Sequence, residues 1–340
     1  MTELVATTPG LYPLPDDAKD DLSDLKGHQK EDLIDGDEGE EVRNVYDRAR
    51  REVVDVQTEA GLDRVVEGQL RWDDMLAPPL TVHDAVETRG LVRYYDNNNF
   101  YRDPVVTDDL DVDGDVAAEL EALSGLTDDP LQAVLPGPYS LASLATDEHY
   151  GDEAEFLAAV AEFLAGEAGA FPEVETLWLL EPSLVTDPPG DGPDARASEA
   201  VDRVAGAVDA DVVVHPYWGA LDETVHAHLL DADVDAVGYD FVTEHESNLY
   251  NINEYGTCDD VALGLVDGQN TLVEAPATVA DRVEWVREGT PGADFDRAYV
   301  TSNTPLFYLP YTRFEAKVRT LAGAVDADPT PDDEAEEVSA

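Results

Sequence analysis

The chain has 340 residues, more than a single hydrophobic core usually holds, so its length predicts one large domain such as an α/β barrel, or two smaller domains. Its 20 basic and 77 acidic residues give a formal net charge of −57, and a field of that sign excludes nucleic acid and anionic lipid as favoured partners. Hydrophobic residues make up 43% of the chain, which is ordinary for a globular protein and argues against disorder as the cause of the acidity.

The basic residues are themselves unusual, because only Lys19, Lys26, Lys30 and Lys317 are lysine. An acidic, lysine-poor surface over a normal core indicates adaptation to a salt-rich cytoplasm, where screening weakens self-repulsion. Cys258 is the single cysteine, which excludes an intrachain disulfide and a thiolate-rich metal site built from this chain alone. No segment approaches the ~18 apolar residues of a membrane span, and no basic region precedes an apolar stretch at the amino terminus. We therefore expect a soluble cytoplasmic protein.

Along the chain, short apolar segments of β type alternate with longer segments whose apolar residues recur at helical spacing. The predicted strands are Leu4–Thr8, Leu62–Val66, Ala133–Leu135, Thr176–Leu180, Asp211–His215, Ala236–Asp240, Val261–Val266 and Ala298–Ser302. The predicted helices are Glu40–Ala60, Asp152–Gly169, Ala195–Val208, Leu221–Asp231, Pro276–Arg287 and Tyr311–Val325. Eight strands alternating with helices predict a (β/α)8 TIM barrel, in a single domain over residues 1–325.

Two segments depart from this alternation. Residues 89–106 (RGLVRYYDNNNFYRDPVV) are rich in aromatic residues and asparagine and lie between two extended stretches. We interpret them as a hairpin insertion or long loop over the barrel mouth; a surface excursion packed by its own tyrosines is an equal alternative. Residues 326–340 form an acidic tail without aromatic residues, for which disorder is the expectation.

In a barrel of this type, active-site groups follow the carboxyl ends of the strands. The residues at those positions are polar and aromatic, which suits an extended organic ligand held by hydrogen bonds and stacking. They are Thr7, Thr8, Gln69, Arg71, Gly137, Glu181, His215, Tyr217, Trp218, Asp240, Asp267, Asn270, Ser302 and Asn303.

Three of these positions have two interpretations each. Glu181 and Asp240 could act as acid and base in a barrel glycoside hydrolase, or each could cap a helix or bind a backbone amide. Because the chain has 77 carboxylates, two at strand ends are expected by chance, and the second interpretation is favoured. His215 could be a metal ligand or general base, but neither HxxxH nor HExxH occurs, so a hydrogen-bonding histidine is favoured.

Several segments are similar, in order along the chain, to motifs of one enzyme family. On them the chain resembles the cobalamin-independent methionine synthase family, and it resembles the N-terminal barrel of that two-barrel enzyme more closely than the C-terminal catalytic barrel. The similarity covers residues 4–325 and implies a barrel of the methionine synthase and uroporphyrinogen decarboxylase type. The segments are TTPGLYPLPDDAK (7–19), AGLDRVVEGQLRWDDML (60–76), RYYDNNNFYRDPV (93–105), LPGPYSLASLA (135–145), LWLLEPSL (177–184), HPYWGALDE (215–223), ALGLVDGQN (262–270) and YVTSNTPLFYLP (299–310).

The resemblance implies transfer of a methyl group from 5-methyltetrahydrofolate polyglutamate to the thiol of homocysteine. In the family, zinc held by His, Cys, Glu and Cys of the C-terminal barrel activates that thiol. Here His215 matches the zinc histidine and Asp240 occupies the Glu position, but Tyr217 and Thr304 stand where the cysteines would be. Gln69 replaces a glutamate of the homocysteine site. We therefore expect no cofactor on this chain alone, and zinc on a separate partner barrel.

The leading hypothesis is a methyltransferase-family barrel of methionine biosynthesis that acts with a separate zinc-bearing catalytic barrel on homocysteine and on 5-methyltetrahydrofolate or another methyl donor. The alternatives are a non-catalytic folate- or corrinoid-binding or structural subunit, and the glycoside hydrolase. An anionic folate tail needs local cations, which Lys19, Arg93 and Arg102 supply. The expected substrate-binding residues are Lys19, Arg93, Asn98, Arg102, Glu181, His215, Trp218, Asp240, Asp267, Asn270 and Asn303.

Overall fold

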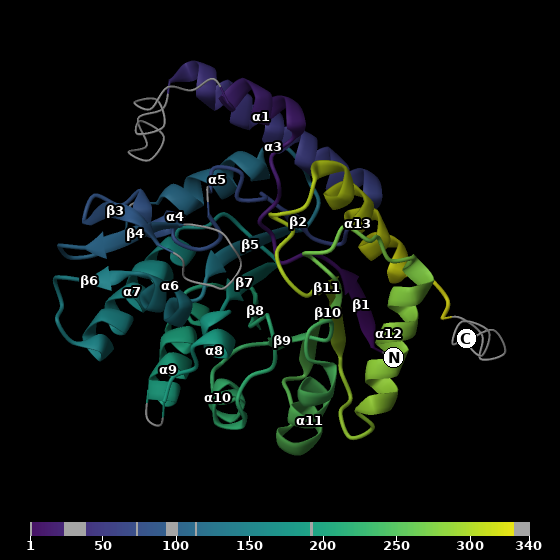
Figure 1. Ribbon diagram of the computed structural model, residues 1–340. Helices are drawn as coiled ribbons and strands as arrows, with labels where there is room; N and C mark the ends of the chain where they lie inside the picture. The colour runs from purple at the N-terminus through teal and green to yellow at the C-terminus, as the bar shows by residue number, and fades with distance from the viewer. Residues whose placement is uncertain are drawn as a thin grey trace.

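The computed structural model describes residues 2–23, 39–72, 74–92, 101–112, 114–190 and 193–329. A sheet of eight parallel strands curls around the core, and helices cover its outer face (Figure 1). Its strands, in the order in which they are hydrogen-bonded, are β1 (Glu3–Ala6), β11 (Arg297–Ser302), β10 (Asp260–Val266), β9 (Ala236–Asp240), β8 (Asp211–His215), β7 (Thr176–Leu180), β5 (Leu131–Pro136) and β2 (Val65–Val66). The α/β barrel class predicted from the sequence is confirmed.

The first and last strands of this order, β1 and β2, meet at Asp63. The Asp63 backbone N–H donates to the Ala6 carbonyl over 3.0 Å, and the Asp63 carboxylate accepts from the Ala6 N–H over 2.7 Å. Farther along, the buried amide of Gln132 on β5 bonds the Thr7 hydroxyl and the Thr8 carbonyl, each over 2.7 Å. This side chain therefore reaches β1 past the short strand β2.

The helices that follow the strands pack their apolar residues against the sheet. In α3, for example, Val42, Val45, Ala49 and Val53 are buried at helical spacing, and Gly61 ends the helix with φ 85°. The helices are α1 (Asp16–Ser23), α3 (Glu40–Ala60), α4 (Pro78–Thr81), α5 (Asp115–Ser124), α6 (Pro138–Leu144), α7 (Glu153–Gly169), α8 (Ser183–Thr186), α9 (Pro193–Ala205), α10 (Glu223–Leu229), α11 (His245–Tyr255), α12 (Pro276–Gly289) and α13 (Tyr311–Ala324). Of these helices, none is long and apolar enough to cross a membrane.

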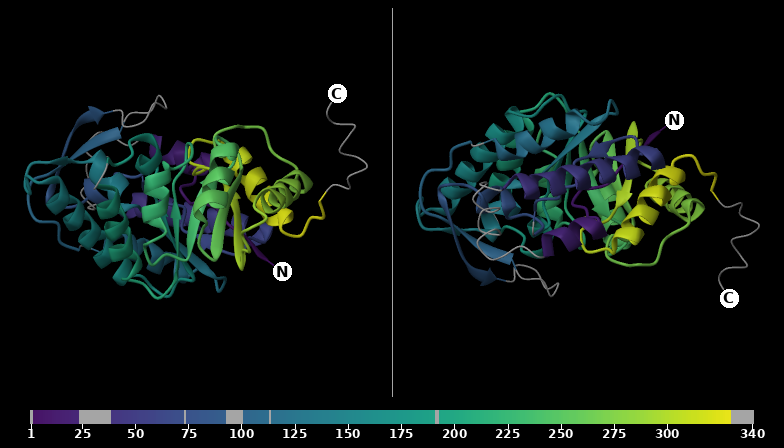
Figure 2. Two further views of the ribbon diagram at one scale, coloured as in Figure 1. Left: turned by 90° about the horizontal axis from the view of Figure 1, so that it is seen from below. Right: turned by 90° about the horizontal axis from the view of Figure 1, so that it is seen from above.

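A small second sheet carries the insertion near residues 89–106. Strands β3 (Val86–Val92) and β4 (Tyr101–Val106) pair antiparallel, and β6 (Thr146–Asp147) pairs with β4. The hairpin interpretation is confirmed for these strands, while residues 93–100 lie outside the described part of the chain. The hairpin projects at one end of the molecule, and α12 and α13 lie at the other (Figure 2).

Three strands were predicted with their observed bounds, whereas α11 was not predicted at all. Its buried face carries Asn248 and Asn251, whose side-chain amides donate to the carbonyls of Asp240 and Leu221 over 2.9 Å each. Because part of its buried face is polar, α11 lacks the apolar periodicity on which the prediction depended.

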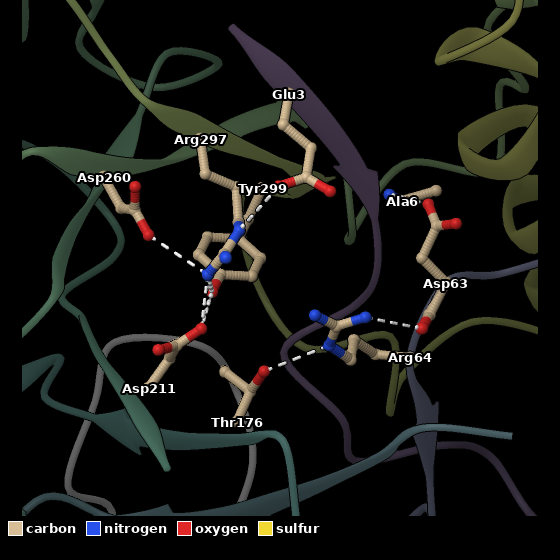
Figure 3. A network of polar contacts seen from close by, with 9 residues as sticks. All are labelled: Glu3, Ala6, Asp63, Arg64, Thr176, Asp211, Asp260, Arg297 and Tyr299. Atoms are coloured by element: carbon tan, nitrogen blue, oxygen red, sulfur yellow. Dashed lines mark hydrogen bonds and ion pairs between the residues drawn. The ribbon is translucent and has the colours of Figure 1, made fainter.

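At the amino-terminal ends of the strands, one arginine joins three carboxylates. The Arg297 guanidinium on β11 contacts Asp211 on β8, Asp260 on β10 over 3.2 Å, and Glu3 on β1 over 3.2 Å (Figure 3). Its Nη1 also donates to the Tyr299 hydroxyl over 3.0 Å. Since catalytic groups of such barrels lie at the opposite, carboxyl-terminal face, this network stabilises the fold.

Candidate functional site

Asn303, which follows β11, joins polar groups from three strand ends. Its side-chain Nδ2 donates to Asp240 Oδ1 over 3.0 Å, its Oδ1 accepts from the Gly268 N–H over 2.9 Å, and its carbonyl accepts from His215 Nε2 over 2.9 Å. His215, Asp240 and Asn303 are all buried. The structure therefore brings together three of the residues predicted for the site.

His215 acts as a neutral hydrogen-bond donor. A carbonyl oxygen only accepts, so Nε2 carries the proton, and burial lowers the pKa of His215 to about 4. Its Nδ1 has no hydrogen-bond partner in the described chain and lies against Gly238, where an added Cβ would be 2.2 Å away. The ring thus packs on β9 and is held by its bond to the Asn303 carbonyl.

Asp240 holds the turns after β8 and β9. Its Oδ1 accepts from the N–H groups of Val242 and Thr243 over 3.0 and 2.8 Å, and its Oδ2 accepts from the Trp218 N–H over 3.0 Å. With the bond from Asn303, four donors surround this carboxylate, although burial still raises its pKa. Asp240 therefore orients backbone amides rather than presenting a free base.

Glu181 has a comparable structural role at α6. Its two carboxylate oxygens accept from the N–H groups of Tyr139 and Ser140 over 3.0 and 2.8 Å, in the first turn of that helix. Gly137 leaves room for the carboxylate, because an added Cβ there would lie 2.1 Å from the Glu181 side chain. Both Glu181 and Asp240 thus bind backbone amides, and no contact supports the glycoside hydrolase.

Backbone strain is concentrated at the mouth of the barrel. Among the residues that the structure describes, Leu11, Gln69 and Trp218 are the non-glycine residues with positive φ, at 50°, 51° and 72°. They follow β1, β2 and β8, and the Leu11 N–H donates to Gln69 Oε1 over 2.8 Å. Such strained conformations persist only where the surrounding structure holds them in place, and they are enriched at functional sites.

A charged cluster at the end of β2 was missed from the sequence. Glu67 accepts from Arg50 Nε over 3.0 Å and from the Gln69 N–H over 2.7 Å, while Glu119 contacts both Arg50 and Arg71. Burial, followed by the charge of Glu119, raises the pKa of Glu67 to about 7. The cluster borders a cavity of about 290 Å³. The sequence held one signal for this cluster, because Glu67 stands directly before Gly68 at the end of a predicted strand.

Some of the other predicted site residues lie at the edge of the Asn303 network, and the rest lie on distant elements. Asp267 Oδ1 accepts from the N–H groups of Gln269 and Asn270, so it closes the turn after β10. Lys19 lies on α1, with Asp16 3.7 Å away, and Arg102 lies on the hairpin strand β4. Arg93 and Asn98 are outside the described residues. A common cationic site for a folate tail therefore stays a prediction.

The residues at the zinc positions do not fit zinc. His215 Nε2 is bonded to a carbonyl, and Asp240 is surrounded by four donors. Tyr217 and Thr304 stand where the resemblance implies thiolate ligands. Cys258 lies between α11 and the amino end of β10, and burial raises the pKa of its thiol to about 11. The chain therefore offers no tetrahedral ligand set here.

The comparisons with known proteins confirm the family, but the matching family model is that of its catalytic domain, whereas the motifs favoured the N-terminal barrel. The family model described as cobalamin-independent synthase, catalytic domain, matches residues 4–320. The chain is 25% identical over 238 residues to a methionine synthase of Thermoplasma acidophilum, which covers 65% of each chain. It is 22% identical over 289 residues to a methionine synthase of Saccharolobus islandicus, which covers 84% of this chain and 83% of the relative.

Solved structures show the same fold along almost the whole chain. A B12-independent methionine synthase from Shewanella sp. W3-18-1, in complex with selenomethionine, superimposes with a TM-score of 0.78 at 19% identity, over 96% of this chain and 97% of that one. A putative vitamin-B12-independent methionine synthase from Listeria monocytogenes gives a TM-score of 0.69 at 17% identity, over 96% and 98%.

Proposed function

Because the chain belongs to the cobalamin-independent methionine synthase family, we propose that it is one barrel of a methionine-forming methyltransferase and works with a separate, zinc-bearing barrel. One observation carries the proposal. The chain keeps the family fold over 96% of its length, while His215 and Asp240, at two of the zinc positions, are both hydrogen-bonded to Asn303, and Asp240 also accepts from backbone amides. A barrel that lacks the metal ligands needs a partner to activate the homocysteine thiol.

In this arrangement the chain positions the methyl donor, and the partner activates the nucleophile. The Asn303 network and the strained residues Leu11, Gln69 and Trp218 make the barrel mouth a rigid surface. Holding a methyl donor there, facing the partner's thiolate, removes the entropic cost of bringing two reactants together. We propose 5-methyltetrahydrofolate or another methyl donor as the ligand and homocysteine as the acceptor.

A reconstitution assay tests the division of labour. The partner is a purified family barrel from the same genome that carries the His, Cys, Glu and Cys ligands. Methyl transfer from 5-methyltetrahydrofolate to homocysteine is measured in molar KCl with each barrel alone and with both. We expect none with this chain alone and a clear rate when both are present.

Two other results separate the alternatives. Methyl transfer by this chain alone would contradict the division of labour, since its zinc positions lack thiolates. A partner that is fully active by itself, together with donor binding by this chain in titration calorimetry, would instead identify a non-catalytic binding subunit.

A further inference from the structure

A second cavity lies beside the Asn303 network, where the loops after β9 and β10 meet α11 and α12. It has a volume of about 410 Å³. Phe241 and Leu265 line its buried part, and His245, Leu272 and Trp285 line its exposed part. We call it the Trp285 cavity. The Trp285 ring meets those of Phe241 and His245 nearly edge-on, with centroids 6.2 and 5.8 Å apart.

The lip of the Trp285 cavity is apolar and open to solvent. Leu272 is 71% exposed and Trp285 is 41% exposed, and Leu272 is the most exposed large hydrophobic residue of the described chain. Single exposed apolar residues are common, but two on the lip of one cavity with an apolar floor form a continuous patch. Such a patch is unusual on a chain with a net charge of −57.

The exposure of Leu272 is built into the fold. Lys317 on α13 is fully buried, and its Nζ donates to the Leu272 carbonyl over 2.6 Å and to Glu274 Oε2 over 2.8 Å. Glu274 Oε1 in turn accepts from the Asp267 N–H over 2.9 Å, and the Thr320 hydroxyl donates to the Glu274 carbonyl over 2.9 Å. Partly buried bonds therefore hold the backbone from Leu272 to Glu274, and a segment that is already ordered loses little further entropy on binding.

We propose that the Trp285 cavity is the docking site for the partner barrel, an inference that rests on the proposed function. The loop residues Phe241 and Asp267 follow the carboxyl ends of β9 and β10, at the face where the Asn303 network lies. A partner that binds at this face to complete the reaction would contact the cavity at the edge of the face.

The charges around the cavity define the chemistry of the partner's docking segment. Asp267 and Glu274 line the cavity, and the exposed Glu244 and Glu246 lie beside it on α11 and its cap. Arg282 is the only cationic side chain among the described lining residues, and it donates to the Leu265 carbonyl. The complementary segment is an aliphatic or aromatic side chain flanked by arginine or lysine. A second copy of this chain is disfavoured, since both copies would bring the same acidic rim.

Binding measurements on surface variants test the docking site. Leu272→Asp and Trp285→Ala change the lip, and Tyr250→Ala is the matched control, because Tyr250 is 50% exposed on α11 but does not line the cavity. The probe is the purified zinc-bearing barrel of the reconstitution assay, titrated in molar KCl. We expect about 10- to 30-fold weaker binding for both lip variants and an unchanged Kd for the control.

Each outcome decides between the two proposals. Equal binding by wild type and Leu272→Asp would overturn the docking site and leave the proposed function intact. Binding that the lip variants lose, without any methyl transfer by the wild-type pair, would support docking and overturn the function. No binding by wild type would overturn both. If Leu272→Asp changes the oligomeric state of the isolated chain in light scattering, the occupant is a second copy and the proposal is wrong.

Discussion

At the scale of single residues, the polar side chains of the barrel mouth are bonded mainly to one another. Asn303 contacts Asp240, Gly268 and His215 through three different atoms, and the donors around Asp240 come from three loops. A buried polar group without a partner costs more than its bond contributes, so replacing any one of these residues affects the others. They hold the loops after β8, β9, β10 and β11 in place.

Glu181 gives a pH-dependent prediction at this scale. Burial raises the pKa of Glu181 to about 7 in the folded protein, above its ordinary value of 4.5. Between these values the folded state binds more protons than the unfolded state, so this group's stabilising contribution is lost as the pH rises through about 7. Glu181→Gln removes the titration. The free energy of unfolding of wild type should decline from pH 5 to 8, and that of the variant should decline less. The difference between the two declines should be at most about 3 kcal/mol.

Denaturant unfolding at several pH values in molar KCl measures this difference. The exposed Glu155→Gln serves as the control and keeps the wild-type slope, because Glu155 lies on the solvent side of α7. If Glu181→Gln has the same slope as wild type, Glu181 does not carry the pH dependence.

At the scale of elements, the strands are held in register by polar contacts at both ends of the sheet. Arg297 links β11 to β1, β8 and β10 at the amino-terminal ends, while Asn303 links the loops at the carboxyl ends. Between them the strands bury continuous apolar runs, such as Val212, Val213 and Val214 in β8. The hydrophobic core defines the sheet, and the polar contacts at its ends add links between strands, including β11 and β8, which are not neighbours in it.

Arg297→Met tests the contribution of the amino-terminal network. The variant leaves Asp211 and Asp260 facing each other without the shared cation, and burial already raises the pKa of Asp260. We expect a loss of roughly 2 kcal/mol in the free energy of unfolding, between the values for exposed and fully buried ion pairs.

Chemical unfolding at pH 7 provides the measurement, and Arg287→Met is the control. Arg287 pairs with Glu284 on the exposed face of α12 over 2.7 Å, so its removal should change stability by less than about 1 kcal/mol. Equal effects of the two substitutions would show that the Arg297 network adds no more than a surface ion pair.

At the scale of the whole molecule, the net charge of −57 is the dominant feature. The excess negative charge repels itself across the surface. Salt shortens the range of that repulsion to a few Å at molar concentration, which favours the compact state. On a surface that is mostly acidic, the few cations and the apolar Trp285 cavity are the distinctive features.

The salt dependence of thermal unfolding follows from this charge. We expect the unfolding temperature to rise by roughly 5–10 °C between dilute buffer and about 2 M KCl, the shift that a few kcal/mol produces. Scanning calorimetry measures it, with an uncharged osmolyte at equal osmolality as the control. A protein that is equally stable in dilute buffer would rule out salt adaptation.

The sequence predicted the architecture well because its signals are local. Thr176–Leu180, Asp211–His215 and Ala236–Asp240 are short apolar runs whose burial follows from their composition, and the structure confirms their bounds. The prediction missed α11, where buried asparagines replace apolar residues, and it missed the Glu67 and Arg50 cluster, whose members are 17 residues apart. Partners of this kind become visible only when the chain is folded.

The sequence by itself determined the barrel, its family motifs, its charge and its single cysteine, because apolar periodicity and residue identity need no partner. Only the tertiary structure decided which strand-end groups meet. His215 and Asp240 reach Asn303 across 88 and 63 residues, and Lys317 reaches the Leu272 carbonyl across 45. A hydrogen bond depends on distances of about 3 Å between atoms far apart in the chain, and the sequence pattern does not encode these distances locally.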